Sequence, residues 1–433
     1  MRIENSLPPK GMRDIEPLFA EVREQAVTRI VETYKKNGFH LIETPAMEKL
    51  ENLVGEKGGE NEKLIFKILR RGLQLDPATP PQENDLVDYG LRYDLTVPLS
   101  RYYANNQENL PKPFKVFQIG PVWRAERPQK SRYRQFTQCD IDILGDASCR
   151  AEIELITVTC KTLSRLGLTD FEVRINDRRI LEKMGNHCAL GNERYREFLI
   201  AMDKLDKKSP NEILFELEKK GFSKETLKSI DGTFQVLLAS QGRMETVMDF
   251  LGINTDWEVT AELRKIMDAV KAFPGLPCSI RFDPTLVRGM DYYTGAIFEI
   301  NKISQNTSIA GGGRYDKMIG GFLGTDVPAC GFSLGFERIV DDLLKTANIA
   351  DFVGSRQTVL FYSEERDEFS KVIACAEKMR EDGSSVSMMP RLRNFANQLT
   401  KLEAVGFGFY SVYSEGKREI LPISAAKFVS DKG

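Results

Sequence analysis

Two neighbouring segments rich in strand-forming residues most constrain the fold of this chain. They are 113–126 (PFKVFQIGPVWRAE) and 134–145 (RQFTQCDIDILG), and a basic polar loop, RPQKSRY, joins them. Two such runs separated by a polar loop predict a long antiparallel hairpin. We therefore expect the first part of the chain to be built around an antiparallel β-sheet.

The order of the other segments predicts two domains in the 433 residues. From about Gln357 the chain alternates strand, helix, strand, helix, strand, which indicates a small sheet covered by helices. We expect an α+β domain over 1–345, with an antiparallel sheet flanked by helices. A Lys- and Glu-rich helical insertion is predicted at about 180–272, and a C-terminal α/β domain at 346–433.

The amino-terminal segment predicts a helix followed by an edge strand. Residues 14–35 carry apolar residues at spacings of three and four, with Asp14 as a candidate N-cap. The strand-like segment 39–48 contains Pro45, which is typical of an edge strand. An edge at this place suits a subunit boundary.

Composition excludes several classes of protein. No apolar run approaches the roughly 20 residues of a membrane helix, and the amino terminus lacks the apolar core of a signal peptide. Seven scattered cysteines without a CxxC pair favour reduced thiols in a cytoplasm. His40 and His187 lie far apart, so we expect no structural metal. The net charge of −2 means that any nucleic acid would bind to local patches.

Three predicted strands each carry ionisable groups on one face, because residues two apart on a strand share a face. The strand pattern of 91–99 (LRYDLTVPL) groups Arg92, Asp94 and Thr96. A second group is Gln138, Asp140 and Asp142, and a third is Arg124 with Glu126. A solvated sheet face is the alternative. Short acids, Gln and Arg, however, suit directional hydrogen bonds and anion binding.

Two further segments combine glycine with arginine. In 286–300 (LVRGMDYYTGAIFEI), Arg288 and Gly289 precede Tyr292 and Tyr293, which suits either a surface turn or an anion site beside a ring-shaped ligand. The stretch 308–322 (SIAGGGRYDKMIGGF) has the composition of a loop that lets a ligand approach the backbone. A plain turn is its alternative. Arg338 begins the next predicted helix, where a cation opposes the helix dipole, so an anion partner is indicated.

Together these segments resemble motifs 1, 2 and 3 of class II aminoacyl-tRNA synthetases. Motif 1 corresponds to the first helix with the Pro45 strand, motif 2 to VWRAERPQKSRYRQF, and motif 3 to AGGGRYD with GFSLGFERI. Within that class LRYDLTVPLSRY, RYRQFTQCDIDILG and VRGMDYYTGAIFE are similar to the histidyl-tRNA synthetase family. The resemblance covers nearly the whole chain. It implies a class II catalytic domain and a C-terminal anticodon-binding-like domain.

The resemblance also implies a reaction and roles for particular residues. Histidine and ATP would give histidyl-adenylate and pyrophosphate, and the histidyl group would pass to the 3′ end of tRNA(His). Arg124 and Arg288 match the arginines at the α-phosphate, and Arg338 matches the arginine at the γ-phosphate. The histidine-binding positions are matched by Asp94, Thr96, Gln138, Asp142, Tyr292 and Tyr293.

Nucleic acid and subunit partners follow from the same resemblance. Basic residues interleaved with an aromatic in the motif 2 loop suit contact with the tRNA acceptor end. They are Arg127, Lys130, Arg132, Tyr133 and Arg134. The resemblance implies a homodimer through motif 1. Mg²⁺ is expected with ATP, and Glu126 is its candidate ligand. No residue is assigned to the anticodon, because 391–413 is less lysine-rich than the family's usual segment.

One alternative belongs to a different functional class. A non-catalytic paralogue, such as the regulatory subunit of ATP phosphoribosyltransferase, would bind histidine without activating it. Such proteins typically lack the C-terminal domain and the catalytic arginines, whereas Arg124, Arg288 and Arg338 are all present here. A class II enzyme for another amino acid is a second alternative, and the RGMDYYTG segment argues against it.

Overall fold

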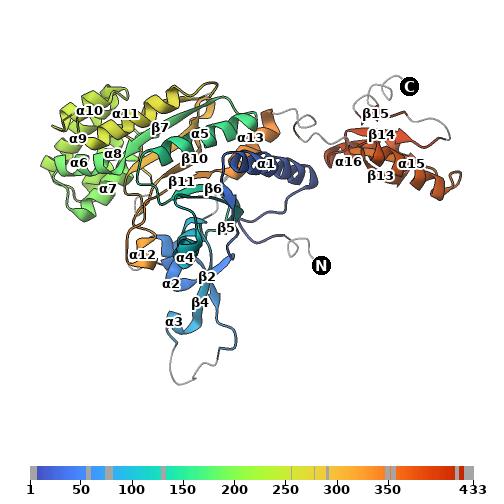
Figure 1. Ribbon diagram of the computed structural model, residues 1–433, viewed down its shortest axis with the longest axis horizontal. Helices are drawn as coiled ribbons and strands as arrows, with labels where there is room; N and C mark the ends of the chain where they lie inside the picture. The colour runs from blue at the N-terminus through green and yellow to red at the C-terminus, as the bar shows by residue number, and fades with distance from the viewer. Residues whose placement is uncertain are drawn as a thin grey trace. The chain divides into compact units, whose positions relative to one another are not determined.

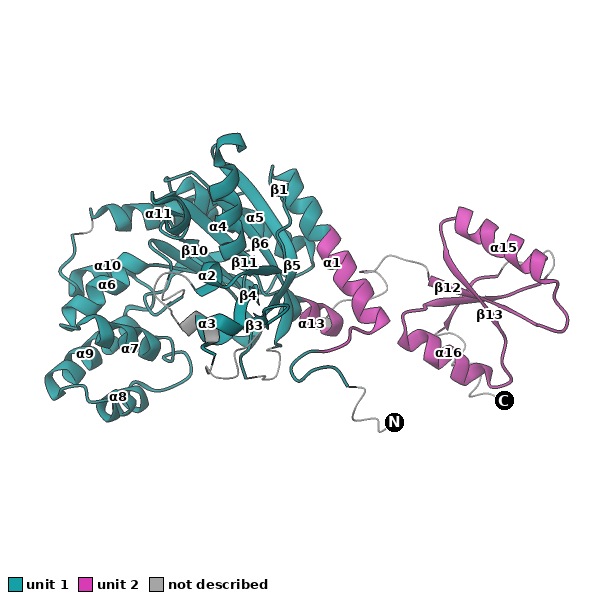
Figure 2. Ribbon diagram, turned by 90° about the horizontal axis from the view of Figure 1, so that it is seen from below, with its two compact units in different colours: residues 1–12, 29–339 teal, residues 13–28, 340–433 magenta. Residues whose placement is uncertain are grey.

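A computed structural model gives the fold (Figure 1) and describes residues 7–54, 60–73, 81–127, 133–254, 256–276, 278–288, 292–346, 352, 357–414 and 419–423. The chain forms two compact units (Figure 2). The first unit comprises Met1–Met12 and Arg29–Ile339, and the second comprises Arg13–Thr28 and Val340–Gly433. The domain boundary at 345/346 stays a prediction. Among the described residues no helix has the length and apolar character needed to cross a membrane.

An eight-stranded sheet is the core of the first unit. Its spatial order is β1 (His40–Leu41), β5 (Phe114–Trp123), β6 (Gln135–Leu144), β11 (Ala329–Leu334), β10 (Thr307–Arg314), β9 (Ala296–Lys302), β7 (Phe171–Asp177) and β8 (Ser279–Phe282). The outer pairs β1–β5 and β7–β8 are parallel, and the other neighbours are antiparallel. The predicted hairpin is confirmed as β5–β6, with Phe114 opposite Leu144 and Trp123 opposite Gln135.

Side-chain alternation gives the sheet one apolar face that is covered by helices. On β6, Ile141 and Ile143 are buried beside Phe117 of β5. Tyr34, near the end of α1 (Pro17–Lys36), packs edge-on against Phe117 with ring centroids 5.4 Å apart. Helix α5 (Arg150–Arg165) packs on β6 and β11, and α13 (Phe336–Thr346) follows β11 in the chain. The opposite face of β6 carries Asp140 and Asp142.

The helical insertion lies between β7 and β8 and gathers at that end of the sheet (Figure 1). A capping box joins Ser209 to Glu212 at the start of its third helix. Its helices are α6 (Arg178–His187), α7 (Asn192–Met202), α8 (Pro210–Lys219), α9 (Lys224–Ser240), α10 (Met244–Phe250) and α11 (Glu258–Lys271). The predicted helical character of 180–272 is confirmed.

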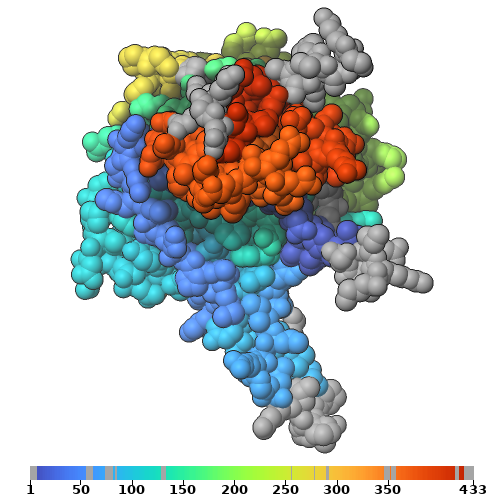
Figure 3. Space-filling view, turned by 90° about the vertical axis from the view of Figure 1, so that its right-hand side faces the viewer, coloured from blue at the N-terminus to red at the C-terminus, as the bar shows by residue number. Residues whose placement is uncertain are grey.

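A small antiparallel sheet stands out from the body of the first unit (Figures 1 and 3). Its order is β2 (Met47–Lys49), β4 (Val87–Leu91) and β3 (Phe66–Leu69). We call it the arm. The short helices α2 (Leu50–Val54), η2 (Glu60–Leu64) and α3 (Glu83–Leu86) accompany it, and α4 (Thr96–Asn106) with η3 (Gln107–Asn109) leads back to β5.

The expectation of one strand over 91–99 is wrong. Strand β4 ends at Leu91, and helix α4 begins at Thr96. The Asp94 carboxylate accepts a hydrogen bond from the Val97 backbone N–H at 3.1 Å, and Pro98 lies in the first helical turn. An acidic acceptor before a helix and a proline within its first turn favour a helix start over a strand.

The expectation of a glycine-rich loop over 308–322 is also wrong in its first half. Residues Thr307–Arg314 form β10, near the middle of the sheet, and the short helices η4 (Ile303–Gln305) and α12 (Gly320–Leu323) flank this region. Glycine inside a strand is typical where another group approaches the backbone closely. For Gly311 of β10 the approaching group is the Arg288 guanidinium.

The second unit contains the predicted alternating α/β domain. Its sheet has the order β13 (Ser385–Pro390), β12 (Gln357–Tyr362), β14 (Phe409–Val412) and β15 (Leu421–Pro422), with the first three strands parallel. Residues of α15 (Phe369–Glu381) pack on Leu360 of β12, and residues of α16 (Phe395–Ala404) pack on Val359 and Phe361. The two helices therefore cover opposite faces, which confirms the α+β followed by α/β organisation.

Candidate active site

A cavity of about 370 Å³ lies over the middle of the large sheet. We call it the sheet cavity. Most of its lining residues are polar and come from β6, β10, β11, the segment before α4 and the segment before β9. It brings together eight residues that the sequence singles out, namely Asp94, Thr96, Arg124, Gln138, Asp142, Arg288, Tyr292 and Tyr293.

The strand register explains why these side chains meet. Asp142 of β6 lies opposite Gly331 of β11, and Gly331 lies opposite Gly313 of β10. Residues directly opposite each other point to the same face. A Cβ atom on Gly331 would lie 1.9 Å from the Asp142 carboxylate oxygen Oδ1. The glycine therefore leaves the space that the carboxylate occupies.

A second glycine makes room for an arginine. A Cβ atom on Gly311 would lie 2.0 Å from Cζ of Arg288, so the guanidinium lies flat against the bare β10 backbone. Arg288 donates hydrogen bonds to Glu299 and, at 3.2 Å, to the Ser308 hydroxyl. The glycine run of β10 thus makes room for a cation of the cavity.

Three carboxyl groups share the cavity, and burial raises the pKa of each. The pKa of Asp94 rises to about 6, and that of Asp140 rises to about 7. Burial together with the nearby charge of Asp140 raises the pKa of Asp142 well above its usual range. Because three acids in one cavity resist ionising together, the cavity favours a cationic or hydrogen-bond-donating ligand.

Tyrosines form the other wall of the cavity. The rings of Tyr292 and Tyr293 lie 4.3 Å apart, and burial raises the pKa of Tyr292 to about 12. Tyr315 donates a hydrogen bond to Asp142 at 2.6 Å. Phenols and a carboxyl group in this arrangement can pair with both nitrogens of a polar ring.

Arg124 is the second cation of the cavity. Its Nε donates to the Tyr93 carbonyl oxygen at 3.0 Å, and its guanidinium lies 5.1 Å from the Phe136 ring centroid. Its backbone N–H donates to the Arg134 carbonyl at 2.8 Å, which closes the end of the β5–β6 hairpin. These contacts hold the side chain in the lining of the cavity.

The other sequence-predicted residues that the structure describes do not line the sheet cavity. Arg338 is exposed and donates to the Ser308 carbonyl oxygen at 2.6 Å. Glu126 and Tyr133 are partly buried, and Arg127 is exposed. Lys130 and Arg132 lie outside the described residues. Over the described part of the chain, no group of three His, Cys, Asp or Glu side chains is arranged to hold a metal ion.

Sequence reasoning gave no role to three polar residues of the cavity, namely Asp140, Ser333 and Tyr315. Ser333 donates to Asp140 at 2.5 Å, and Gln138 donates to Ser333 at 3.2 Å. Asp140 could have been predicted as a site residue, because it shares a strand face with Gln138 and Asp142. Ser333 and Tyr315 needed the register between β6, β11 and β10.

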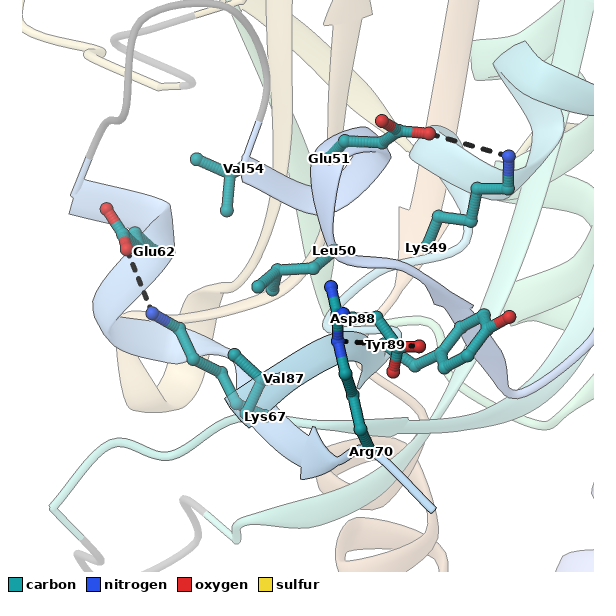
Figure 4. A pocket seen from close by; sticks show the side chains of 10 residues that line it. All are labelled: Lys49, Leu50, Glu51, Val54, Glu62, Lys67, Arg70, Val87, Asp88 and Tyr89. Atoms are coloured by element: carbon teal, nitrogen blue, oxygen red, sulfur yellow. Dashed lines mark hydrogen bonds and ion pairs between the residues drawn. The ribbon is translucent and has the colours of Figure 1, made fainter. Parts of the chain in front are cut away.

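A larger pocket of about 690 Å³ lies on the arm (Figure 4). We call it the arm pocket. Its charged side chains pair with one another, as Lys49 with Glu51 at 3.5 Å, Lys67 with Glu62 at 2.9 Å, and Arg70 with Asp88 at 3.9 Å. None of the residues predicted to act in catalysis or binding lines it. We therefore take the sheet cavity as the candidate active site.

A largely antiparallel sheet with arginines and buried acids over its middle, in a chain that ends in a small α/β unit, is the arrangement that class II aminoacyl-tRNA synthetase motifs imply. Comparison with known proteins is specific. A family model described as histidyl-tRNA synthetase matches residues 11–339. The chain therefore belongs to the histidyl-tRNA synthetase family.

Individual relatives agree over nearly the full length. A protein of Leifsonia xyli subsp. xyli named histidine–tRNA ligase is 43% identical over 408 residues, covering 92% of this chain and 93% of its own. One of Porphyromonas gingivalis with the same name is 32% identical over 448 residues and covers 98% of both chains.

Solved structures share the fold. A histidyl-tRNA synthetase from Nostoc sp. PCC 7120 aligns with a TM-score of 0.73 at 24% identity, over 99% of this chain and 100% of its own. A Bacillus halodurans protein, described as an ATP phosphoribosyltransferase regulatory subunit/histidyl-tRNA synthetase, aligns with a TM-score of 0.71 at 22% identity. It covers 94% of this chain and 97% of its own.

Proposed function

We propose that this chain is a histidine–tRNA ligase that makes histidyl-adenylate from histidine and ATP and passes the histidyl group to tRNA(His). The observation that carries the proposal is the sheet cavity, where two arginines face buried acids and tyrosines in a chain of this family. The cations suit phosphates, and the acids and phenols suit an amino group and a polar ring.

In the first step a carboxylate oxygen of histidine attacks the α-phosphorus of ATP, and the bond from that phosphorus to the leaving pyrophosphate breaks. Negative charge gathers on the phosphoryl oxygens, so the step needs positioned cations more than a strong base. Arg124 and Arg288 supply these cations in the proposal. In the second step a 3′-terminal hydroxyl of tRNA attacks the carbonyl carbon, and AMP leaves.

Histidine would lie with its ammonium group near Asp94, Thr96 and Gln138. The ammonium group would favour the ionised form of Asp94, whose pKa burial raises to about 6 in the free protein. The imidazole would face Asp142 with Tyr292 and Tyr293. Paired polar groups of this kind reject apolar analogues by as much as ~10⁴–10⁵, so specificity would need no editing domain.

ATP would extend from this cavity toward Arg338, at the γ-phosphate. Magnesium is proposed to enter as part of the ATP complex, with Glu126 as its candidate protein ligand.

Partners beyond the small substrates follow from the family. The tRNA acceptor end is proposed to contact Arg127, Lys130, Arg132 and Tyr133. We also propose a homodimer formed through the segment of motif 1, and a cytoplasmic location. The dimer is testable by sedimentation of the purified chain.

Pyrophosphate exchange with each of the twenty amino acids tests the function. We expect exchange that depends on histidine. Histidine binding without exchange would instead support the regulatory-subunit alternative, and exchange with another amino acid but not histidine would refute the assigned specificity.

A further inference from the structure

Three residues on adjacent strands form a row that ends under Arg288. Arg174 of β7 lies opposite Glu299 of β9, and Glu299 lies opposite Gly311 of β10. Since directly opposite residues share a face, the Arg174 and Glu299 side chains lie on the face where Arg288 covers Gly311. The row therefore runs from β7 into the sheet cavity.

Glu299 lies between two arginines. Its Oε2 accepts a hydrogen bond from Arg288, and its Oε1 lies 3.7 Å from Nη1 of Arg174. Asn301, with its amide oriented by the hydrogen-bond network, donates to Glu299 at 2.7 Å and accepts from Arg174 at 2.9 Å. The Glu299 side chain is only 13% exposed. A carboxylate held from both sides has little freedom to move.

The far end of the row reaches the helical insertion. Arg174 is 5% exposed in its side chain and donates to Asp206 through Nη1 at 3.0 Å and Nη2 at 3.4 Å. Its Nε donates to Asp283, just after β8. Asp206 belongs to the turns between α7 and α8. Charges thus alternate along one path from Asp206 through Arg174 and Glu299 to Arg288.

The path couples its members because Arg174 is shared. A buried charge that loses one partner moves toward another or draws in water, since leaving it unpaired is costly. Displacement of Asp206 would therefore change how Arg174 holds Glu299, and Glu299 fixes the guanidinium of Arg288. Loss of position by a fraction of an ångström at a catalytic cation is enough to slow a reaction.

We propose that Glu299 and Arg174 are positioning residues that hold Arg288 in place for adenylate formation, and that the helical insertion sets this position through Asp206. The inference rests on the proposed role of Arg288. It makes the placement of the insertion a determinant of the rate at the α-phosphate, while the residues proposed to bind histidine stay in place.

The test measures histidine-dependent adenylate formation by the full chain, per active site, with the E299Q and D206N variants. We expect E299Q to lower kcat by about 10²-fold and D206N by about tenfold, with KM for histidine changed by less than about threefold. The matched control is E216Q, which breaks the neighbouring ion pairs of Glu216 with Lys204 and Lys208 in the insertion. Its rate should stay within about twofold of the wild type.

Combination with R288A separates positioning from folding. A residue that acts through Arg288 has little further effect once Arg288 is gone, so E299Q and D206N should change the residual rate of R288A by less than about twofold. Equal losses with and without Arg288 would overturn the proposal, since they indicate a general structural role. Normal rates for E299Q and D206N beside an inactive R288A would also overturn it. A near-normal R288A would instead refute the proposed role of Arg288 itself.

Discussion

The arm pocket, at about 690 Å³, is larger than the sheet cavity, at about 370 Å³, but its charges are arranged differently. In the arm pocket three cations pair with three carboxylates at its surface. In the sheet cavity Arg124 is held by a backbone carbonyl and Arg288 by Glu299, outside the cavity lining, while burial raises the pKa values of three acids in the cavity. Acids with raised pKa values in the sheet cavity, more than pocket volume, therefore indicate the ligand-binding site.

Replacing one arginine of each pocket by alanine should give the largest difference in activity between the two regions. Arg124→Ala should lower histidine-dependent pyrophosphate exchange by about 10²–10³-fold, because a positioned cation at developing phosphoryl charge is lost. Arg70→Ala should change it by less than about twofold, since Arg70 belongs to an exposed pair with Asp88. Comparable rates for the two variants would remove the functional distinction between the pockets.

Replacing one carboxylate in each pocket sharpens the comparison toward substrate recognition. Asp142→Asn should raise KM for histidine by about 10²-fold, because the imidazole N–H and the Tyr315 hydroxyl lose a carboxyl acceptor. KM for ATP should change by less than about threefold. Asp88→Asn is the control and should leave both constants unchanged. An equal rise of the two KM values after Asp142→Asn would contradict a role at the imidazole.

Substituting one glycine in each region should affect histidine binding in the sheet cavity and folding stability in the arm. In Gly331→Ala the new Cβ must displace the Asp142 carboxylate, so we expect about tenfold weaker histidine binding. In Gly90→Ala, on the arm, the new Cβ meets Ile65 at 2.6 Å and Leu53 at 2.9 Å. Overpacking of this kind should destabilise the fold by about 1–3 kcal/mol. Histidine titration and thermal unfolding of both variants measure the two effects.

A control glycine completes that pair. Nothing lies within 4 Å of a Cβ built on Gly321, so Gly321→Ala should leave histidine affinity unchanged and should not lower the melting temperature. If Gly331→Ala lowered only the melting temperature, the glycine would serve packing and not the shape of the binding site.

The contrast between the two pockets also explains which parts of the fold and of the site could be predicted from the sequence. Long strand-forming runs predicted β5 and β6, and spacing within β6 placed Gln138, Asp140 and Asp142 on one face, because two-residue alternation is a local property. The eight gathered site residues came from the family resemblance together with these faces. The arm pocket left no comparable signal, since its paired charges are typical of any exposed surface.

Other features depended on information that no local pattern contains. The pattern of 91–99 suited a strand, but the Asp94 carboxylate and Pro98 start a helix. The glycines of β10 suggested a loop, because the side chain that fills their space, Arg288, lies elsewhere in the chain. Ser333 reaches Asp140 only through strand register, which a single sequence does not give.

The pH dependence of stability gives the smallest expected effect and tests the cost of the buried acids directly. Burial raises the pKa of Asp140 to about 7, above its unfolded value of 3.8, so the folded state retains a proton that the unfolded state releases. The stability contribution of this group is therefore present below pH 4 and is lost as the pH rises to 7. Solvent entering an open cavity reduces the effect, and we expect the ligand-free wild type to lose about 1 kcal/mol of unfolding free energy between pH 5 and 8.

Denaturant unfolding of the Asp140→Asn variant tests this origin of the pH dependence. The substitution should flatten the slope of stability against pH. Added histidine should flatten it too, because its ammonium group stabilises the ionised acids. An unchanged slope in Asp140→Asn would mean that Asp140 carries no such cost, and that the electrostatic contrast with the arm pocket rests on Asp94 and Asp142 alone.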